Sequence, residues 1–225
     1  MNLSKMLGAQ AIAKGCYLLA ALFVVSAHGQ NYEITPLVGA TFGGTMHLEQ
    51  TGTPNFYAHI ADSINFGLAG GYRLEGAEGE GYDVIEFRWM RQNSHLSVHQ
   101  EPLVPTPYAP PSFRPSISLD HFLGDFTHEF AIKEAPSIQP LVSGSLGAAL
   151  MSVPDSNAVR FEFGVGAGVK IFPSKHYGFR VKAEYLPIVM HTELQSLVCA
   201  GGCVVILNGG IMNQFEVTLG PAFRF

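Results

Sequence analysis

Eight segments of the chain alternate apolar and polar side chains with a period of two. In the last segment Phe215 and Val217 alternate with Glu216 and Thr218, and the pattern continues to Phe225. Because successive side chains of a β-strand point to opposite faces, each segment predicts a strand with one apolar and one polar face. The predicted strands span residues 32–42, 63–74, 82–91, 120–132, 138–151, 160–172, 177–189 and 213–225.

The connectors between these strands alternate in length. Residues 43–62, 92–119 and 190–212 form long connectors, whereas 75–81, 133–137 and 173–176 are short and 152–159 is intermediate. Successive connectors of an up-and-down sheet lie at opposite ends, so the long ones, which are every second connector, are predicted at one end. With an even number of strands, both termini then lie at the other end.

The amino-terminal segment predicts a secretory signal peptide over residues 1–29. Lys5 and Lys14 precede an apolar run at 16–25, and small residues follow up to Gly29. We place the cleavage after Gly29, with Ala27 as the other candidate, which leaves residues 30–225 as one domain. No other segment approaches the ~18 consecutive apolar residues of a transmembrane helix.

Charge and composition narrow the classes of partner. After cleavage eleven basic residues face eighteen acidic ones, a formal charge of −7 that argues against a nucleic-acid partner. Charged residues make up 14 % of the chain, against about 25 % in ordinary soluble domains. This shortfall favours a surface that faces lipid, although a secreted all-β sandwich shares it.

The polar faces of the predicted strands carry a nearly balanced set of charges. In a soluble sandwich this face would be solvated, whereas a closed barrel of about eight strands encloses it and fills it with side chains. Buried charges must pair, since an unpaired one is costly. The predicted interior network consists of Glu33, Glu86, Asp125, Glu129, Glu162, Glu184 and Glu216 with Arg73, Arg88, Lys170, Arg180, Lys182 and Arg224.

The signal peptide, the eight amphipathic strands, the alternating connectors and the terminal Phe225 together resemble the small eight-stranded outer-membrane barrels of bacteria, such as the transmembrane domain of outer-membrane protein A and the opacity and outer-membrane protein X families. The resemblance implies an all-β, eight-stranded antiparallel up-and-down transmembrane β-barrel in outer-membrane lipid, with both termini periplasmic. It also implies that Phe215, Phe223 and Phe225 form a carboxy-terminal insertion signal for the barrel-assembly machinery. A ten-stranded barrel, with an extra hairpin in 92–119 or 190–212, is the main alternative.

Catalytic and metal chemistry have weak support in the sequence. Lipid A deacylases among such barrels use a His-x-Ser motif, but the nearest pair here, His191 and Ser196, lacks that spacing. We therefore predict no enzyme, with deacylase-like activity as the less favoured alternative. Most histidines, His121 among them, fall in or near predicted connectors. His95 and His99 would share a helix face but lie ~13 Å apart on a strand, so no metal or cofactor is predicted.

Two connector features remain. Cys199 and Cys203 are predicted to form a disulfide, because the compartment is oxidising. Residues 101–115 hold six prolines and predict an extended loop that could serve as a recognition surface. The predicted function is therefore a structural and surface-interaction role through the long outer loops, with a possible surface ligand there. A narrow pore or small-ligand conduit gated by the inner charges is the alternative.

Overall fold

The computed structural model describes residues 31–48, 56–74, 81–100, 116–154, 156–190, 196–199, 203–206 and 210–225. Within these residues the chain forms twelve strands, and no helix there is long and apolar enough to cross a membrane. The strands are β1 (Tyr32–Gly43), β2 (Thr45–Leu48), β3 (Phe56–Ile60), β4 (Ser63–Leu74), β5 (Tyr82–Gln100), β6 (Ser116–Glu129), β7 (Ile138–Val153), β8 (Ser156–Ile171), β9 (Tyr177–Met190), β10 (Ser196–Cys199), β11 (Cys203–Ile206) and β12 (Gly210–Arg224).

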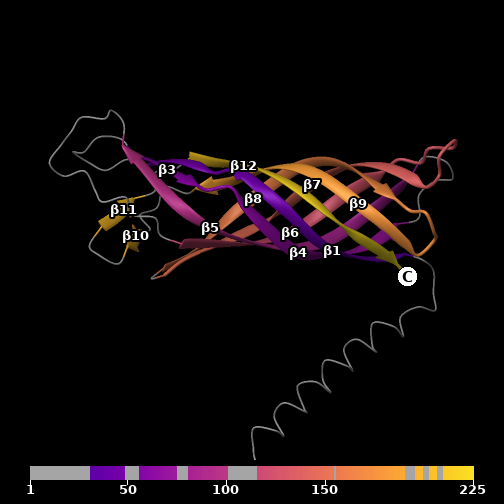
Figure 1. Cartoon of the computed structure of the whole chain (residues 1–225), viewed down its shortest axis with the longest axis horizontal. Helices are drawn as coiled ribbons and strands as arrows, with labels where there is room; N and C mark the ends of the chain where they lie inside the picture. The colour runs from indigo at the N-terminus through magenta and orange to yellow at the C-terminus, as the bar shows by residue number, and fades with distance from the viewer. Residues whose placement is uncertain are drawn as a thin grey trace, which may run out of the picture.

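Eight of the strands close into an antiparallel barrel (Figure 1). Their order around the wall is β5-β4-β1-β12-β9-β8-β7-β6, and β6 pairs back to β5. Each of the eight predicted strands overlaps one of these wall strands, so the predicted fold class is confirmed. Several strands are longer than predicted: β5 runs on to Gln100, and β7 and β8 leave only a tight turn between Val153 and Ser156.

The register fixes how strongly the wall strands tilt. A path from partner to partner around the barrel leaves β1 at Phe42 and returns to β1 at Tyr32, a shift of ten residues. The path runs through Phe215, Tyr185, Val165, Gly144, Phe126, Ile85 and Tyr72. A barrel of eight strands with this shear has strongly tilted strands and a lumen that side chains can fill.

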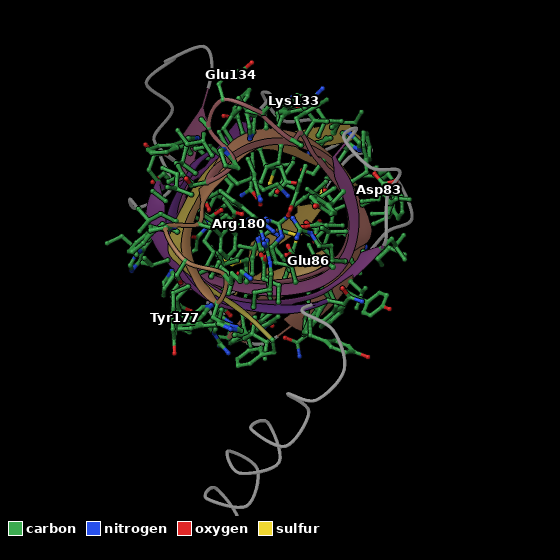
Figure 2. All side chains as sticks on the ribbon, turned by 90° about the vertical axis from the view of Figure 1, so that its right-hand side faces the viewer. Asp83, Glu86, Lys133, Glu134, Tyr177 and Arg180 are labelled. Atoms are coloured by element: carbon green, nitrogen blue, oxygen red, sulfur yellow. The ribbon has the colours of Figure 1, made fainter. Side chains whose placement is uncertain are left out.

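The two faces of the wall have opposite character, as the alternation predicts. Phe215 and Leu146 point outward and are 56 % and 64 % exposed, whereas Glu216 and Arg88 point inward and are buried. Figure 2, which looks along the barrel from the end where the chain terminates, shows Tyr177 outside the ring and Arg180 inside it. The outer surface is therefore an apolar belt, and the polar faces are enclosed.

Two hairpins lie at the far end of the barrel, which is the end opposite the carboxy terminus (Figure 1). β3 of the β2–β3 hairpin pairs with the last residues of β5, and β10–β11 forms a separate two-stranded sheet. The predicted long connectors 43–62 and 190–212 thus each contain a hairpin, which is a correction. β10–β11 stays outside the wall sheet, and the β2–β3 hairpin only extends that sheet along the end of β5, beyond β4. Neither hairpin adds a strand to the closed ring of eight, so the ten-stranded alternative is wrong.

Candidate functional site

The lumen near the carboxy-terminal end holds a cluster of five charged side chains, the terminal cluster: Glu33, Arg73, Glu129, Lys170 and Arg224. Lys170 Nζ donates to Glu129 Oε1 at 2.6 Å and also to Glu33. Arg224 Nη2 donates to Glu33 Oε2 at 3.0 Å, and Arg73 Nη2 to Glu129 Oε2 at 3.1 Å. The five residues come from β1, β4, β6, β8 and β12, so the cluster ties most of the wall together.

A second group, the central cluster, surrounds Arg88 and contains Asp125, Lys182, Glu184 and Glu216. Arg88 Nη1 lies 2.9 Å from Glu216 Oε1, Nη2 lies 2.5 Å from Glu184 Oε2, and Nε lies 3.1 Å from Asp125 Oδ2. Lys182 Nζ lies 3.2 Å from both Asp125 and Glu184. All five side chains are buried. Three carboxylates therefore share two cations without access to water.

One further ion pair crosses the lumen. Arg180 Nη1 donates to Glu86 Oε1 and Oε2 at 2.7 and 2.6 Å. Arg180 lies on β9 and Glu86 on β5, which is the fourth strand away in either direction around the wall. Figure 2 shows both side chains meeting inside the ring. Because the partners stand on opposite walls, this pair blocks a straight path along the barrel axis.

Glu162 has a partner that the sequence analysis missed. His121 Nδ1 lies 2.7 Å from Glu162 Oε2, and both side chains are buried. The prediction that placed His121 in or near a connector was wrong, because β6 begins at Ser116 and His121 faces inward from its middle. Arg160 is a buried basic residue that the analysis also missed. Arg160 is two residues before Glu162 on β8, so both side chains point to the same, inner face of the strand. This alternation could have identified Arg160 as an interior residue from the sequence.

The lumen changes from polar to apolar at the far end. Ile188, Met190 and Met212 are buried there, although they continue the inward faces that carry Glu184 and Glu216 nearer the centre. The sequence analysis predicted charges inside but no apolar interior. We call this group the apolar plug; it consists of Ile60, Leu96, Ile117, Leu119, Ala149, Met151, Ile188, Met190 and Met212. Together with the ion pairs, it fills the lumen along its length.

Two phenylalanines of the predicted insertion signal, Phe215 and Phe223, lie on β12, the closing strand, and Phe225 follows it directly. Phe215 points outward, and Phe223 packs edge-to-face against Tyr177 with ring centroids 5.9 Å apart. Phe225 N donates to Tyr32 O at 2.8 Å, and Tyr32 N to Phe225 O at 3.3 Å. The last residue therefore joins the two ends of the wall. Its role as an insertion signal stays a prediction.

The remaining predicted residues lie in or beyond the far hairpins. Cys199 and Cys203 are partners in the β10–β11 ladder, and their disulfide stays a prediction. Ser196 begins β10, whereas His191 and residues 101–115 lie outside the described residues. His95 is on the strand β5 rather than a helix. Among the described residues no three or more His, Cys, Asp or Glu side chains group as a metal site.

Comparison with known proteins shows similarity in fold only. The chain matches no family profile and no curated protein sequence. Neisserial surface protein A is 14 % identical with a TM-score of 0.51, over 88 % of this chain and 98 % of that one. OprG of Pseudomonas aeruginosa is 11 % identical with a TM-score of 0.55, over 87 % and 95 %. The fold is that of the small eight-stranded outer-membrane barrels.

One of the structures that the comparison matches is an enzyme. The outer-membrane enzyme PagL is 16 % identical with a TM-score of 0.41, over 86 % of this chain and 99 % of that one. A likeness of this degree carries no argument about activity. Function must therefore be argued from the lumen and the surface of this chain.

Proposed function

We propose that the protein is an integral outer-membrane barrel with a structural and surface-interaction role, performed by its far end. The observation that supports this proposal most strongly is the filled lumen. Ion pairs such as Arg180–Glu86 join opposite walls, and the apolar plug follows beyond them. With the wall occupied by lipid contact and the lumen by internal packing, the far end is what remains for recognition.

The apolar belt supports the membrane location. Outward side chains such as Phe87, Val165 and Phe179 are more than half exposed. Exposed apolar area of this extent around a closed barrel fits hydrocarbon rather than water. A soluble sandwich would instead bury these side chains between two sheets.

The connectors support one orientation. At the carboxy-terminal end short connectors join β6 to β7 and β8 to β9, whereas the far end carries the two hairpins and the long extension of β5. Bacterial barrels place short turns in the periplasm and longer loops outside. The proposal therefore places both termini in the periplasm and the far end at the cell surface.

Labelling of single cysteines in intact cells tests the location and orientation. In a background with Cys199→Ser and Cys203→Ser, we expect a membrane-impermeant maleimide to label Asn157→Cys, an exposed position at the far end. Lys133→Cys, exposed on the short β6–β7 connector, should react only after the outer membrane is permeabilised. Equal labelling of both positions, or recovery of the protein in the soluble fraction, would contradict the proposal.

The interaction role needs a separate test, because a barrel can be correctly oriented and yet bind nothing. A photocrosslinking residue at Tyr108, in the proline-rich segment, should form a reproducible adduct on intact cells. The same residue at Lys133 serves as the control at the periplasmic end. The interaction role fails if Tyr108 yields no adduct beyond those formed from Lys133.

A further inference from the structure

A ring of five side chains faces the lumen near its carboxy-terminal end, and we call it the arginine rim. Each member continues the inward-facing alternation of its strand, or follows that strand directly. Tyr82 is 38 % exposed, and Arg73 and Gln139 are half-buried, so dissolved molecules can reach this part of the lumen. The arginine rim consists of Arg73 on β4, Tyr82 on β5, Gln139 on β7, Arg224 on β12 and Phe172, which directly follows β8.

Aromatic rings hold both guanidinium groups of the arginine rim in place. Arg73 Cζ lies 3.5 Å from the centre of the Tyr82 ring, and Arg224 Cζ lies 3.8 Å from the centre of the Phe172 ring. Stacking over the face of a ring is favourable for a cation, and it leaves the N–H groups at the edge of the planar guanidinium able to donate. Each arginine therefore presents an oriented edge of donors.

The two guanidinium groups converge on one oxygen atom. Arg73 Nη2 and Arg224 Nη2 each donate to Gln139 Oε1 at 3.5 Å. These hydrogen bonds are long, since arginine donates to anionic oxygens at about 2.7–2.9 Å. Arg73 Nε, which lies beside Nη2 on the same edge of the guanidinium, has no hydrogen-bond partner among the described residues. A neutral amide oxygen thus occupies a point at which an anionic oxygen would be held more strongly.

The distribution of charge along the lumen leaves this end positive. The terminal cluster contains three cations and two carboxylates, whereas the central cluster contains two cations and three carboxylates. The neutral pair Arg180–Glu86 separates the two clusters, because Arg180 precedes Lys182 on β9 and Glu86 precedes Arg88 on β5. The surplus positive charge therefore lies at the end that solvent reaches, where it attracts anions.

We propose that the arginine rim binds a phosphate group. One phosphate oxygen accepts from Arg73 Nη2 and Arg224 Nη2 in place of Gln139 Oε1, and a second accepts from Arg73 Nε. Phosphate matches the fork of guanidinium donors, and its negative charge offsets the surplus of the terminal cluster. The phosphate is either a free ion or a lipid headgroup, and the experiment distinguishes these sources. The proposal goes beyond the surface-interaction role, which concerns the far end, and does not depend on it.

The arginine side chains provide the readout. Protein expressed from the full chain, in a nonionic detergent and a buffer without phosphate or sulfate, is titrated with inorganic phosphate while the proton–nitrogen NMR signals of arginine Nε are recorded. We expect the signals of Arg73 and Arg224 to shift together, with a single dissociation constant. The signal of Arg180 should not move, because its guanidinium is buried against Glu86 deeper in the lumen. Sodium chloride at equal ionic strength should cause no saturable shift.

A water-soluble lipid separates the two sources of phosphate. Dihexanoyl phosphatidic acid carries the same phosphate group as a monoester on short acyl chains. If it binds at least about tenfold more tightly than inorganic phosphate, the ligand is a lipid headgroup. If it binds equally or more weakly, the ligand is a free ion. Both outcomes support the arginine rim as the phosphate site, provided that the same two arginine signals shift.

Two variants of Gln139 test the point of convergence without removing a charge from the terminal cluster. The carboxylate of Gln139→Glu would pair with both arginines itself. This variant should therefore unfold at a higher urea concentration and bind phosphate at least about tenfold more weakly. Gln139→Ala removes the competing amide oxygen and should bind phosphate at least as tightly as the unmodified protein. Arg91→Leu, which removes a positive charge from the outer wall, should leave the phosphate affinity unchanged.

Three results would overturn the inference. The first is the absence of a saturable phosphate-dependent shift of the Arg73 and Arg224 signals. The second is unchanged phosphate affinity in Gln139→Glu, and the third is a loss of affinity in Arg91→Leu as large as that in Gln139→Glu. Failure of the proposed membrane location is recognised separately, because the cysteine-labelling experiment does not involve the arginine rim.

Discussion

At the scale of single residues, Arg88 is the side chain that holds the carboxylates of the central cluster together. It contacts three carboxylates, and its side chain is fully buried. Removal of one partner from a buried ion pair leaves the others uncompensated, at a cost of about 3–5 kcal/mol. Arg88→Leu should lower the free energy of unfolding by at least about that amount, measured by urea unfolding in lipid bilayers.

Arg91→Leu is the matched control for this prediction. Arg91 is three residues further along β5 but points outward, and among the described residues its side chain pairs only with Asp120, in a partly exposed contact. Exposed pairs contribute about 0–1 kcal/mol. An equal decrease in the free energy of unfolding in the two variants would contradict the prediction. It would mean that water reaches the central cluster and that burial does not strengthen its ion pairs.

At the scale of the element, β7 contains two glycines with opposite tolerance for a side chain. A Cβ on Gly147 would lie 2.0 Å from Phe122 O and 2.9 Å from Leu123 Cα of the neighbouring β6. A Cβ on Gly144 would meet nothing within 4 Å. Gly147→Ala should therefore force β6 and β7 apart and lower the unfolding free energy by several kcal/mol, on the order of an overpacked core.

Gly144→Ala is expected to leave the unfolding free energy unchanged or slightly raised, since alanine has less backbone freedom to lose. Both variants are compared by urea unfolding and by the fraction that retains the compact mobility of a folded barrel in unheated gels. A Gly147→Ala variant as stable as Gly144→Ala would show that the wall at β6–β7 is looser than its register indicates.

The closing strand β12 carries a second prediction at this scale. Phe225 makes two backbone hydrogen bonds with Tyr32 and ends the chain on an aromatic ring. Deletion of Phe225 should reduce the amount of folded barrel in cells several-fold. Phe179→Ala is the control, because it removes an outward phenylalanine of β9 without affecting the closing strand. Similar yields from both would remove the support for an insertion signal.

At the scale of the whole molecule, the filled lumen predicts the absence of conductance. The pair Arg180–Glu86 and the apolar plug block the lumen at two different depths. In planar bilayers we therefore expect no stable single-channel steps from the unmodified protein, and none after Ile188→Ala with Met212→Ala, since the ion pairs remain. Regular steps from the unmodified protein would favour the conduit alternative instead.

The sequence alone was enough to predict the eight wall strands and the face on which most charges lie. Alternation with a period of two is a local property, so Glu86, Arg88 and Arg180 could be placed inside before any partner was known. Closed barrels also pair strands that follow one another along the chain, and this makes their order predictable. The carboxy-terminal strand was recognisable for the same reason, from Phe215 to Phe225.

Only the tertiary structure decided which charges meet and where the lumen becomes apolar. Arg180 reaches Glu86 because a closed wall with a shear of ten residues places β5 and β9 opposite each other. The alternation of residues along one strand carries no information about which strand lies across the lumen. His121 contacts Glu162, and Met212 lies in one buried cluster with Ile188, for the same reason. The direction of each side chain is fixed by its own strand, whereas its partner is fixed by closure of the barrel.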